Sequence, residues 1–199
     1  MTASTVVLRM LRGARHLLAC AVLAMPLAFA NANAAQPAVS DAGDSTLRVK
    51  AAYLYKFAGY VEWPSGAFAS EDSPLVIGVL GNDRLEQILS HMIVGKTVDG
   101  RALVVRRLEV GSPLQGVHML IVGTLDTPTL RAIGETVRGK PILVVSDAGQ
   151  TRALDSMISF DLVDEHLRFN VALKPAETSG LKLRALMLTA ARRVTRGDP

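Results

Sequence analysis

Residues 74–83, PLVIGVLGND, combine a continuous apolar run with a turn, and this combination decides the fold class. The run over 75–80 is rich in β-branched residues and carries no charge, as expected for a strand buried on both faces of a sheet. The next residues turn the chain into a helix, with Asn82 or Asp83 as the N-cap. A strand, turn and helix in this order are typical of a parallel sheet covered by helices.

The same alternation continues along the chain. The expected strands are 74–80, 103–108, 118–122, 141–145, 157–160 and 167–171, and the expected helices are 46–63, 84–93, 127–139 and 175–193. Asp164, Glu165 and His166 separate the last two strands, a spacing that suits an antiparallel hairpin. We therefore predict one three-layer α/β domain. Its sheet is mixed and mostly parallel, with helices on both faces and an antiparallel C-terminal edge hairpin.

The N-terminal residues have the features of a secretory signal peptide. Arg9, Arg12 and Arg15 precede an uncharged run over 17–29, and small residues fill 30–35. The run is shorter than the roughly 20 residues that cross a bilayer, so we expect an exported protein without direct membrane insertion. The chain then divides into a cleaved signal peptide (1–35), a flexible leader (36–45) and a folded domain (46–196).

Charge and cysteine content exclude several classes of function. Three of the 22 Lys and Arg and none of the 18 Asp and Glu lie in the predicted signal peptide, which leaves 19 basic and 18 acidic residues and a net charge of +1. Such a chain lacks the basic footprint of nucleic-acid-binding proteins, so no nucleic-acid partner is expected. Cys20 is the only cysteine and lies in the signal peptide, which excludes disulfides and thiol nucleophiles from the mature chain.

The histidines of the mature chain give no sign of a metal site. His91, His118 and His166 fall on a predicted helix, a strand start and a turn. A zinc site needs three or four convergent ligands, and no two of these histidines have ligand spacing. We expect no metal and no other cofactor.

A small-molecule crevice is one alternative for the function. Open α/β sheets bind ligands beyond the carboxyl ends of their strands, where this chain places Asn82, Asp83, Ser146 and Asp147. A protein that used this crevice would be a periplasmic small-molecule-binding sensor domain.

A hydrolase is a third hypothesis. Its catalytic set would consist of Ser146, His118 or His166, and Asp155. However, no Gly-x-Ser-x-Gly elbow encloses Ser146.

Residues 50–64, KAAYLYKFAGYVEWP, hold every tyrosine of the chain and its only tryptophan. One interpretation is that this apolar helix packs on the sheet, since aromatic side chains supply the largest burial per residue. The other is that it also presents an interface, where Tyr and Trp are enriched. We expect Tyr53, Phe57, Tyr60 and Trp63 to lie at an interface, either dimeric or with another protein.

Several blocks of sequence carry a family resemblance. They are 50–57 (KAAYLYKF), 61–64 (VEWP), 77–81 (IGVLG), 141–147 (PILVVSD), 157–160 (MISF), 168–171 (RFNV) and 180–183 (GLKL). In this order they resemble the YfiR-like family of exported bacterial proteins.

The resemblance implies a non-enzymatic periplasmic regulator. The best known members form homodimers and bind the periplasmic sensory domain of an inner-membrane diguanylate cyclase, which restrains cyclic-di-GMP synthesis. Others are encoded beside sensor kinases, so the expected partner is the periplasmic domain of a cyclase or of a kinase. This chain departs from the family in two ways. Asp155 and Ser156 replace a usual glycine pair, and without a mature cysteine the disulfide-based redox control of some members cannot operate.

Overall fold

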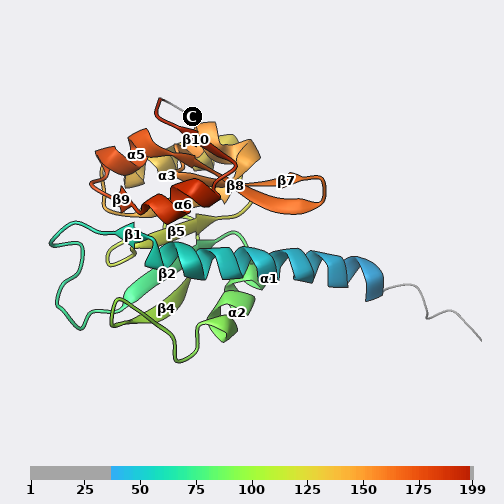
Figure 1. The fold of residues 1–199 in the computed structure, drawn as a ribbon, viewed down its shortest axis with the longest axis horizontal. Helices are drawn as coiled ribbons and strands as arrows, with labels where there is room; N and C mark the ends of the chain where they lie inside the picture. The colour runs from blue at the N-terminus through green and yellow to red at the C-terminus, as the bar shows by residue number, and fades with distance from the viewer. Residues whose placement is uncertain (1–36, 198–199) are drawn as a thin grey trace, which may run out of the picture. The chain divides into compact units, whose positions relative to one another are not determined.

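The computed structural model describes residues 37–197, with side chains from residue 43 onward. The predicted signal peptide lies outside the described residues. The described part is an α/β domain built on an eight-stranded sheet (Figure 1). From one edge to the other, the strands are β10 (Arg193–Thr195), β8 (His166–Ala172), β7 (Ile158–Val163), β6 (Leu143–Asp147), β5 (Met119–Val122), β2 (Leu75–Leu80), β4 (Arg101–Leu108) and β3 (Thr97–Val98).

Most neighbouring strands of this sheet are parallel, as predicted. Only β7–β8 and β3–β4 pair antiparallel in the described sheet. The interior place of β2 in the sheet follows from its composition. Leu75, Ile77 and Val79 are buried on one face of the sheet, and Gly78 and Leu80 on the other.

Helices cover both faces of the sheet, so the predicted three layers are confirmed. Helices α1 (Pro37–Gly59) and α2 (Asp83–Met92) lie on one face, where Phe57 packs in the same core cluster as Ile77. The other face is covered by α3 (Thr127–Val137) and by α4 (Thr151–Leu154), which follows the 3-10 helix η1 (Ala148–Gln150). Figure 1 shows α1 as a long helix in front of the strands, next to α2.

Helix α1 begins earlier than the sequence indicates. We predicted a flexible leader over 36–45, whereas the helix starts at Pro37. Proline fits the first turn of a helix because its missing N–H would have no partner there. Further along, Arg84 Nε of α2 donates a hydrogen bond of 2.9 Å to Asp44. This hydrogen bond and the charge of Arg84 lower the pKa of Asp44 and hold the early part of α1 against α2.

The C-terminal segment is a correction. We predicted one long helix over 175–193, but this segment consists of α5 (Leu173–Thr178), β9 (Lys182–Leu183), α6 (Ala185–Ala190) and β10. Gly180 has a φ of +70°, which ends α5 because the left-handed region interrupts a right-handed helix. Leu181 is then buried, and β9 pairs antiparallel with β1 (Val61–Glu62), directly after α1.

The predicted hairpin is present and is closed by a tight turn. Asp164 and Glu165 connect β7 to β8, and both have positive φ, as the favoured two-residue hairpin turns require. Strand β10 adds to the outer side of β8, so it and not the hairpin forms this edge. At the family's glycine pair, Asp155 takes the left-handed conformation, with φ 56°. The turn therefore forms without glycine.

Gly123 provides a test of the sheet's packing. A Cβ at this position would lie 2.3 Å from the carbonyl oxygen of Gly81, so Gly123→Ala forces two backbone segments apart. We expect the free energy of unfolding in urea to fall by about 1–3 kcal/mol, the usual cost of overpacking. Gly149→Ala is the control, because a Cβ there meets nothing within 4 Å. Equal stability of the two variants would contradict this packing.

Candidate functional site

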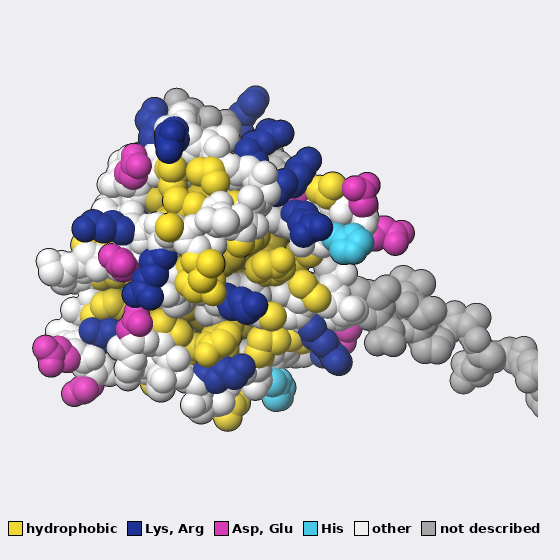
Figure 2. All heavy atoms as spheres, in the orientation of Figure 1, with side chains coloured by type: hydrophobic (Ala, Val, Ile, Leu, Met, Phe, Trp, Pro, Cys, Tyr) yellow, Lys and Arg dark blue, Asp and Glu magenta, His cyan; other side chains and the backbone are white. Residues whose placement is uncertain are grey.

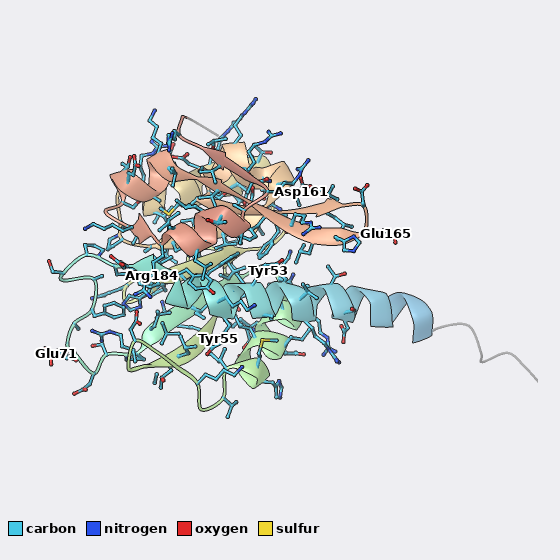
Figure 3. All side chains as sticks on the ribbon, viewed as in Figure 1. Tyr53, Tyr55, Glu71, Asp161, Glu165 and Arg184 are labelled. Carbon is cyan, nitrogen blue, oxygen red and sulfur yellow. The ribbon has the colours of Figure 1, made fainter. Side chains whose placement is uncertain are left out.

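The aromatic residues of helix α1 lie in several different environments. Its inner side, with Ala51, Leu54 and Phe57, is buried against the sheet. Figure 3 shows Tyr53 and Tyr55 on opposite flanks of the helix. Tyr55 lies beneath the Nζ of Lys96, which is 4.5 Å from its ring centroid.

An aromatic cluster joins α1 to the C-terminal hairpin. The ring of Phe57 stacks with Phe160 of β7 at 5.8 Å and meets Phe169 of β8 edge-on at 4.9 Å. Tyr53 packs against the same two rings at 6.0 and 5.5 Å. Because Phe57 is only 1% exposed, our expectation that it lies at an interface is wrong: its side chain is core. Tyr53 stays partly exposed.

A charged pair lies beside this cluster. Lys50 Nζ of α1 donates a hydrogen bond of 2.6 Å to Asp147 Oδ1 at the end of β6, and it lies 5.3 Å from the Phe160 ring centroid. The Lys50 side chain is only 11% exposed, and a charge this well buried needs a partner. The pair therefore fixes the rotation and position of α1 over the sheet.

The four predicted crevice residues each bond within the protein. Asn82 caps α2 by accepting from the N–H of Leu85 at 2.9 Å. Asp83 accepts from Arg107 at 3.0 Å. The Ser146 hydroxyl donates to Ser156 at 2.8 Å, and Asp147 holds Lys50. Strand β5 lies between β2 and β6, so the two pairs belong to different sections of the sheet edge. Ligand binding there stays a prediction.

The outer side of α1 continues into α6 as a partly apolar surface. We call it the α1–α6 face and define it by Val49, Tyr53, Lys56, Tyr60 and Leu186. Val49 is 46% exposed and Leu186 is 60% exposed. The backbone N–H of Arg184, the N-cap of α6, donates to the carbonyl of Tyr60 at 2.9 Å, which joins the two elements. Figure 2 shows hydrophobic side chains gathered over α1 and α6, with Lys and Arg side chains among them.

A comparison with protein-family models matches residues 47–192, from α1 to the residue before β10, to the family described as YfiR/HmsC-like. The chain belongs to the YfiR/HmsC-like family. The resemblance predicted from the sequence is thereby confirmed. A search of curated proteins found no match. Family membership indicates a periplasmic regulatory protein connected with cyclic-di-GMP signalling.

Two further searches concern the described residues alone. None of their helices is long and apolar enough to span a bilayer. No group of three or more His, Cys, Asp or Glu among them is placed to hold a metal ion.

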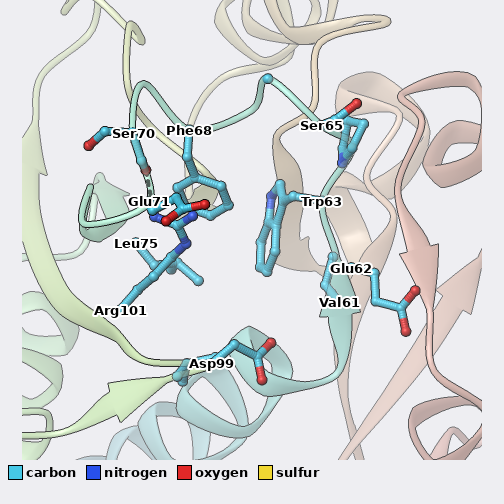
Figure 4. Close-up of a pocket in the computed structure, with 13 residues that line it drawn as sticks. Val61, Glu62, Trp63, Ser65, Phe68, Ser70, Glu71, Leu75, Asp99 and Arg101 are labelled. Carbon is cyan, nitrogen blue, oxygen red and sulfur yellow. Dashed lines mark hydrogen bonds between the residues drawn. The ribbon is translucent and has the colours of Figure 1, made fainter.

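The YfiR/HmsC-like domain also contains a pocket of about 650 Å³ next to β1 (Figure 4). Trp63 forms one wall and Phe68 and Arg101 form another. Its lining consists of Val61, Glu62, Trp63, Pro64, Ser65, Gly66, Phe68, Ser70, Glu71, Leu75, Val98, Asp99 and Arg101. Trp63, which we expected at an interface, thus belongs to a pocket wall.

A stack of three side chains supports this pocket. The Phe68 ring lies between the imidazole of His118, at 4.1 Å, and the guanidinium of Arg101, at 3.9 Å. His118 Nδ1 accepts from the N–H of Val76 at 3.1 Å, so its Nε2 carries the proton and donates to the carbonyl of Ala67 at 3.1 Å. Burial lowers the pKa of His118 and the charge of Arg101 lowers it further, whereas the hydrogen bond to Ala67 opposes this shift.

Sequence reasoning missed this stack and the Lys50–Asp147 pair. Neither Phe68 nor Arg101 belongs to a motif, and His118 was considered only as a metal ligand or a catalytic base. Lys50 and Asp147 each lie within a block shared with the family, 50–57 and 141–147, and these blocks were the signal in the sequence.

The pH dependence of stability tests the role of His118. Its pKa is lower in the folded than in the unfolded chain, where it is near 6.5. As the pH falls below about 6.5, His118 binds a proton in the unfolded chain but not in the folded chain. The free energy of unfolding should then fall by at most about 1.4 kcal/mol per pH unit. His118→Gln, which cannot be protonated, should lose this contribution in urea titrations at pH 5–7.

The control is His166→Gln, because His166 is exposed on the hairpin. It should keep the wild-type pH profile. If His118→Gln keeps that profile as well, the neutral, buried histidine described here is incorrect.

Proposed function

We propose that this protein binds the periplasmic sensory domain of an inner-membrane diguanylate cyclase and holds the cyclase in its inactive state. The observation that carries the proposal is the α1–α6 face, an exposed apolar surface on a member of the YfiR/HmsC-like family. The predicted signal peptide over 1–35 would direct the protein to the periplasm and would then be cleaved.

The composition of the α1–α6 face supports a protein partner. Tyr53 and Tyr60 supply large, partly exposed rings, and Val49 and Leu186 supply apolar area around them. Lys56 adds an exposed positive charge. Aromatic and apolar residues are enriched at the cores of protein interfaces, and this surface contains both kinds.

Inhibition by such contact requires unequal affinities. The regulator restrains the cyclase only if it binds the inactive conformation of the sensory domain more tightly than the active one. Each tenfold preference shifts that equilibrium by about 1.4 kcal/mol. A rigid surface suits this task, because the aromatic cluster and the Lys50–Asp147 pair hold α1 in one position.

A second candidate is a small-molecule-binding sensor domain that works with a sensor kinase. The pocket beside Trp63 favours it, since its volume falls within the usual range for small ligands. Homodimer formation, also expected from the family, is compatible with either function.

Cyclic-di-GMP levels in the native host test the first proposal whichever cyclase is the partner. Deletion of the gene should raise the cellular level, and re-expression of the wild type should lower it again. Val49→Glu and Leu186→Glu should each fail to restore the low level, because a buried, unpaired carboxylate opposes binding. Both side chains are exposed, so neither change should disturb the fold.

Val110→Glu is the matched control, because Val110 is 63% exposed and lies outside the α1–α6 face. It should restore the low level as the wild type does. Immunoblots must show equal periplasmic amounts of all variants. An unchanged level upon deletion, or full restoration by Val49→Glu and Leu186→Glu, would contradict the proposal.

A further inference from the structure

We propose that the pocket beside Trp63 binds a small aromatic amine in its protonated, cationic form. The site is separate from the α1–α6 face and does not depend on which partner that face binds. Its ligand is defined by the shape and the charge of the pocket walls.

Binding of an aromatic cation first requires an aromatic wall that is held in a fixed position. The Nε1–H of Trp63 donates to the carbonyl of His118 at 3.3 Å, and the indole meets Phe68 edge-on, with centroids 6.1 Å apart. These contacts hold the indole in place as one wall of the pocket (Figure 4). A flat ring that enters the pocket meets an aromatic surface that is already positioned.

The second requirement is negative charge around that wall. The lining includes the carboxylates of Glu62, Glu71 and Asp99 and one cation, Arg101. Glu71 has no ion-pair partner among the described residues. Arg184, at the edge of α6, approaches Glu62 at 3.4 Å and Asp99 at 3.5 Å, and all three side chains are well exposed. The carboxylates therefore outnumber the cations at the pocket.

The single cation of the lining is already engaged in structural contacts. Arg101 Nη1 donates to the carbonyls of Ser70 and Ser73 at 2.9 and 2.8 Å, and its guanidinium lies over the Phe68 ring. These contacts close the loop that forms the outer wall of the pocket. Arg101 is thus a support for the wall, and its bonds to the loop compete with any ligand anion.

Together these features select a cation with a flat apolar body. An ammonium group gains from nearby carboxylates and from the face of a Trp ring, which is the most favourable partner for cation–π contacts. The ring of the ligand gains from stacking on the indole. A volume of about 650 Å³ accommodates a ligand of one or two rings.

The sole tryptophan makes a direct binding assay possible. Fluorescence excited selectively in tryptophan reports only on Trp63. We would titrate the purified mature protein with phenethylamine, 2-phenylethanol and 3-phenylpropionate, which share a ring and differ in charge. Phenethylamine should change the emission saturably, and the neutral and anionic analogues should bind at least about fivefold more weakly.

Removal of two of the three lining carboxylates tests the charge argument. Glu71→Gln combined with Asp99→Asn should weaken phenethylamine binding by about fivefold or more. Asparagine tolerates the left-handed conformation of residue 99, where φ is 48°. Glu135→Gln combined with Asp164→Asn is the matched control: it removes the same charges elsewhere, and residue 164 also has a φ of 48°.

Three results would overturn the proposal. They are the absence of a saturable response to phenethylamine, binding of 3-phenylpropionate as tight as that of phenethylamine, and equal affinities of the two double variants. Thermal melts establish that each variant is folded. If the first double variant were unstable, Glu71→Gln alone would serve, because Glu71 is exposed and bonds to no described residue.

Discussion

The attachment of α1 to the carboxyl-terminal half of the sheet is the contact on which the rest of the molecule depends. Phe57 packs against Phe160 and Phe169, and Lys50 reaches the end of β6 to pair with Asp147. The aromatic contacts bury apolar area, whereas the ion pair gives the helix one position, because Lys50 would otherwise be a buried charge without a partner. Because these contacts fix the inner side of α1, the outer side of the helix is also held in one position.

The two surfaces with functional interest lie on either side of the point where α1 ends. The α1–α6 face is built on the outer side of the helix, and the pocket begins directly after it at β1. Arg184 touches both regions, since its backbone bonds to Tyr60 while its side chain approaches Glu62 and Asp99. Arg184 therefore links the pocket wall to the α1–α6 face.

The sequence was sufficient for the features that depend on local pattern. The β-branched run over 75–80 predicted a strand buried on both faces, and Asp164 and Glu165 lie where a hairpin turn was expected. The sequence was insufficient where the local structure depends on contacts with residues far away along the chain. The segment after residue 175 has helical composition, but Gly180 and the pairing of β9 with β1 divide it. Tertiary contacts here outweigh helix propensity.

Sequence reasoning met the same limit at the candidate site. An aromatic-rich stretch predicted an interface, yet only the fold shows that Phe57 is core, that Trp63 lines a pocket and that Tyr53 and Tyr60 remain on the surface. Site-specific photocrosslinking in the native periplasm is the most direct test of binding through the α1–α6 face. A photoreactive phenylalanine is placed at position 49 or 186 on this face, or at position 110 or 135 outside it. The account predicts adducts from positions 49 and 186 with a membrane protein that carries a cytoplasmic cyclase domain. Adducts from positions 110 or 135 instead, or only adducts of the chain with itself, would contradict it.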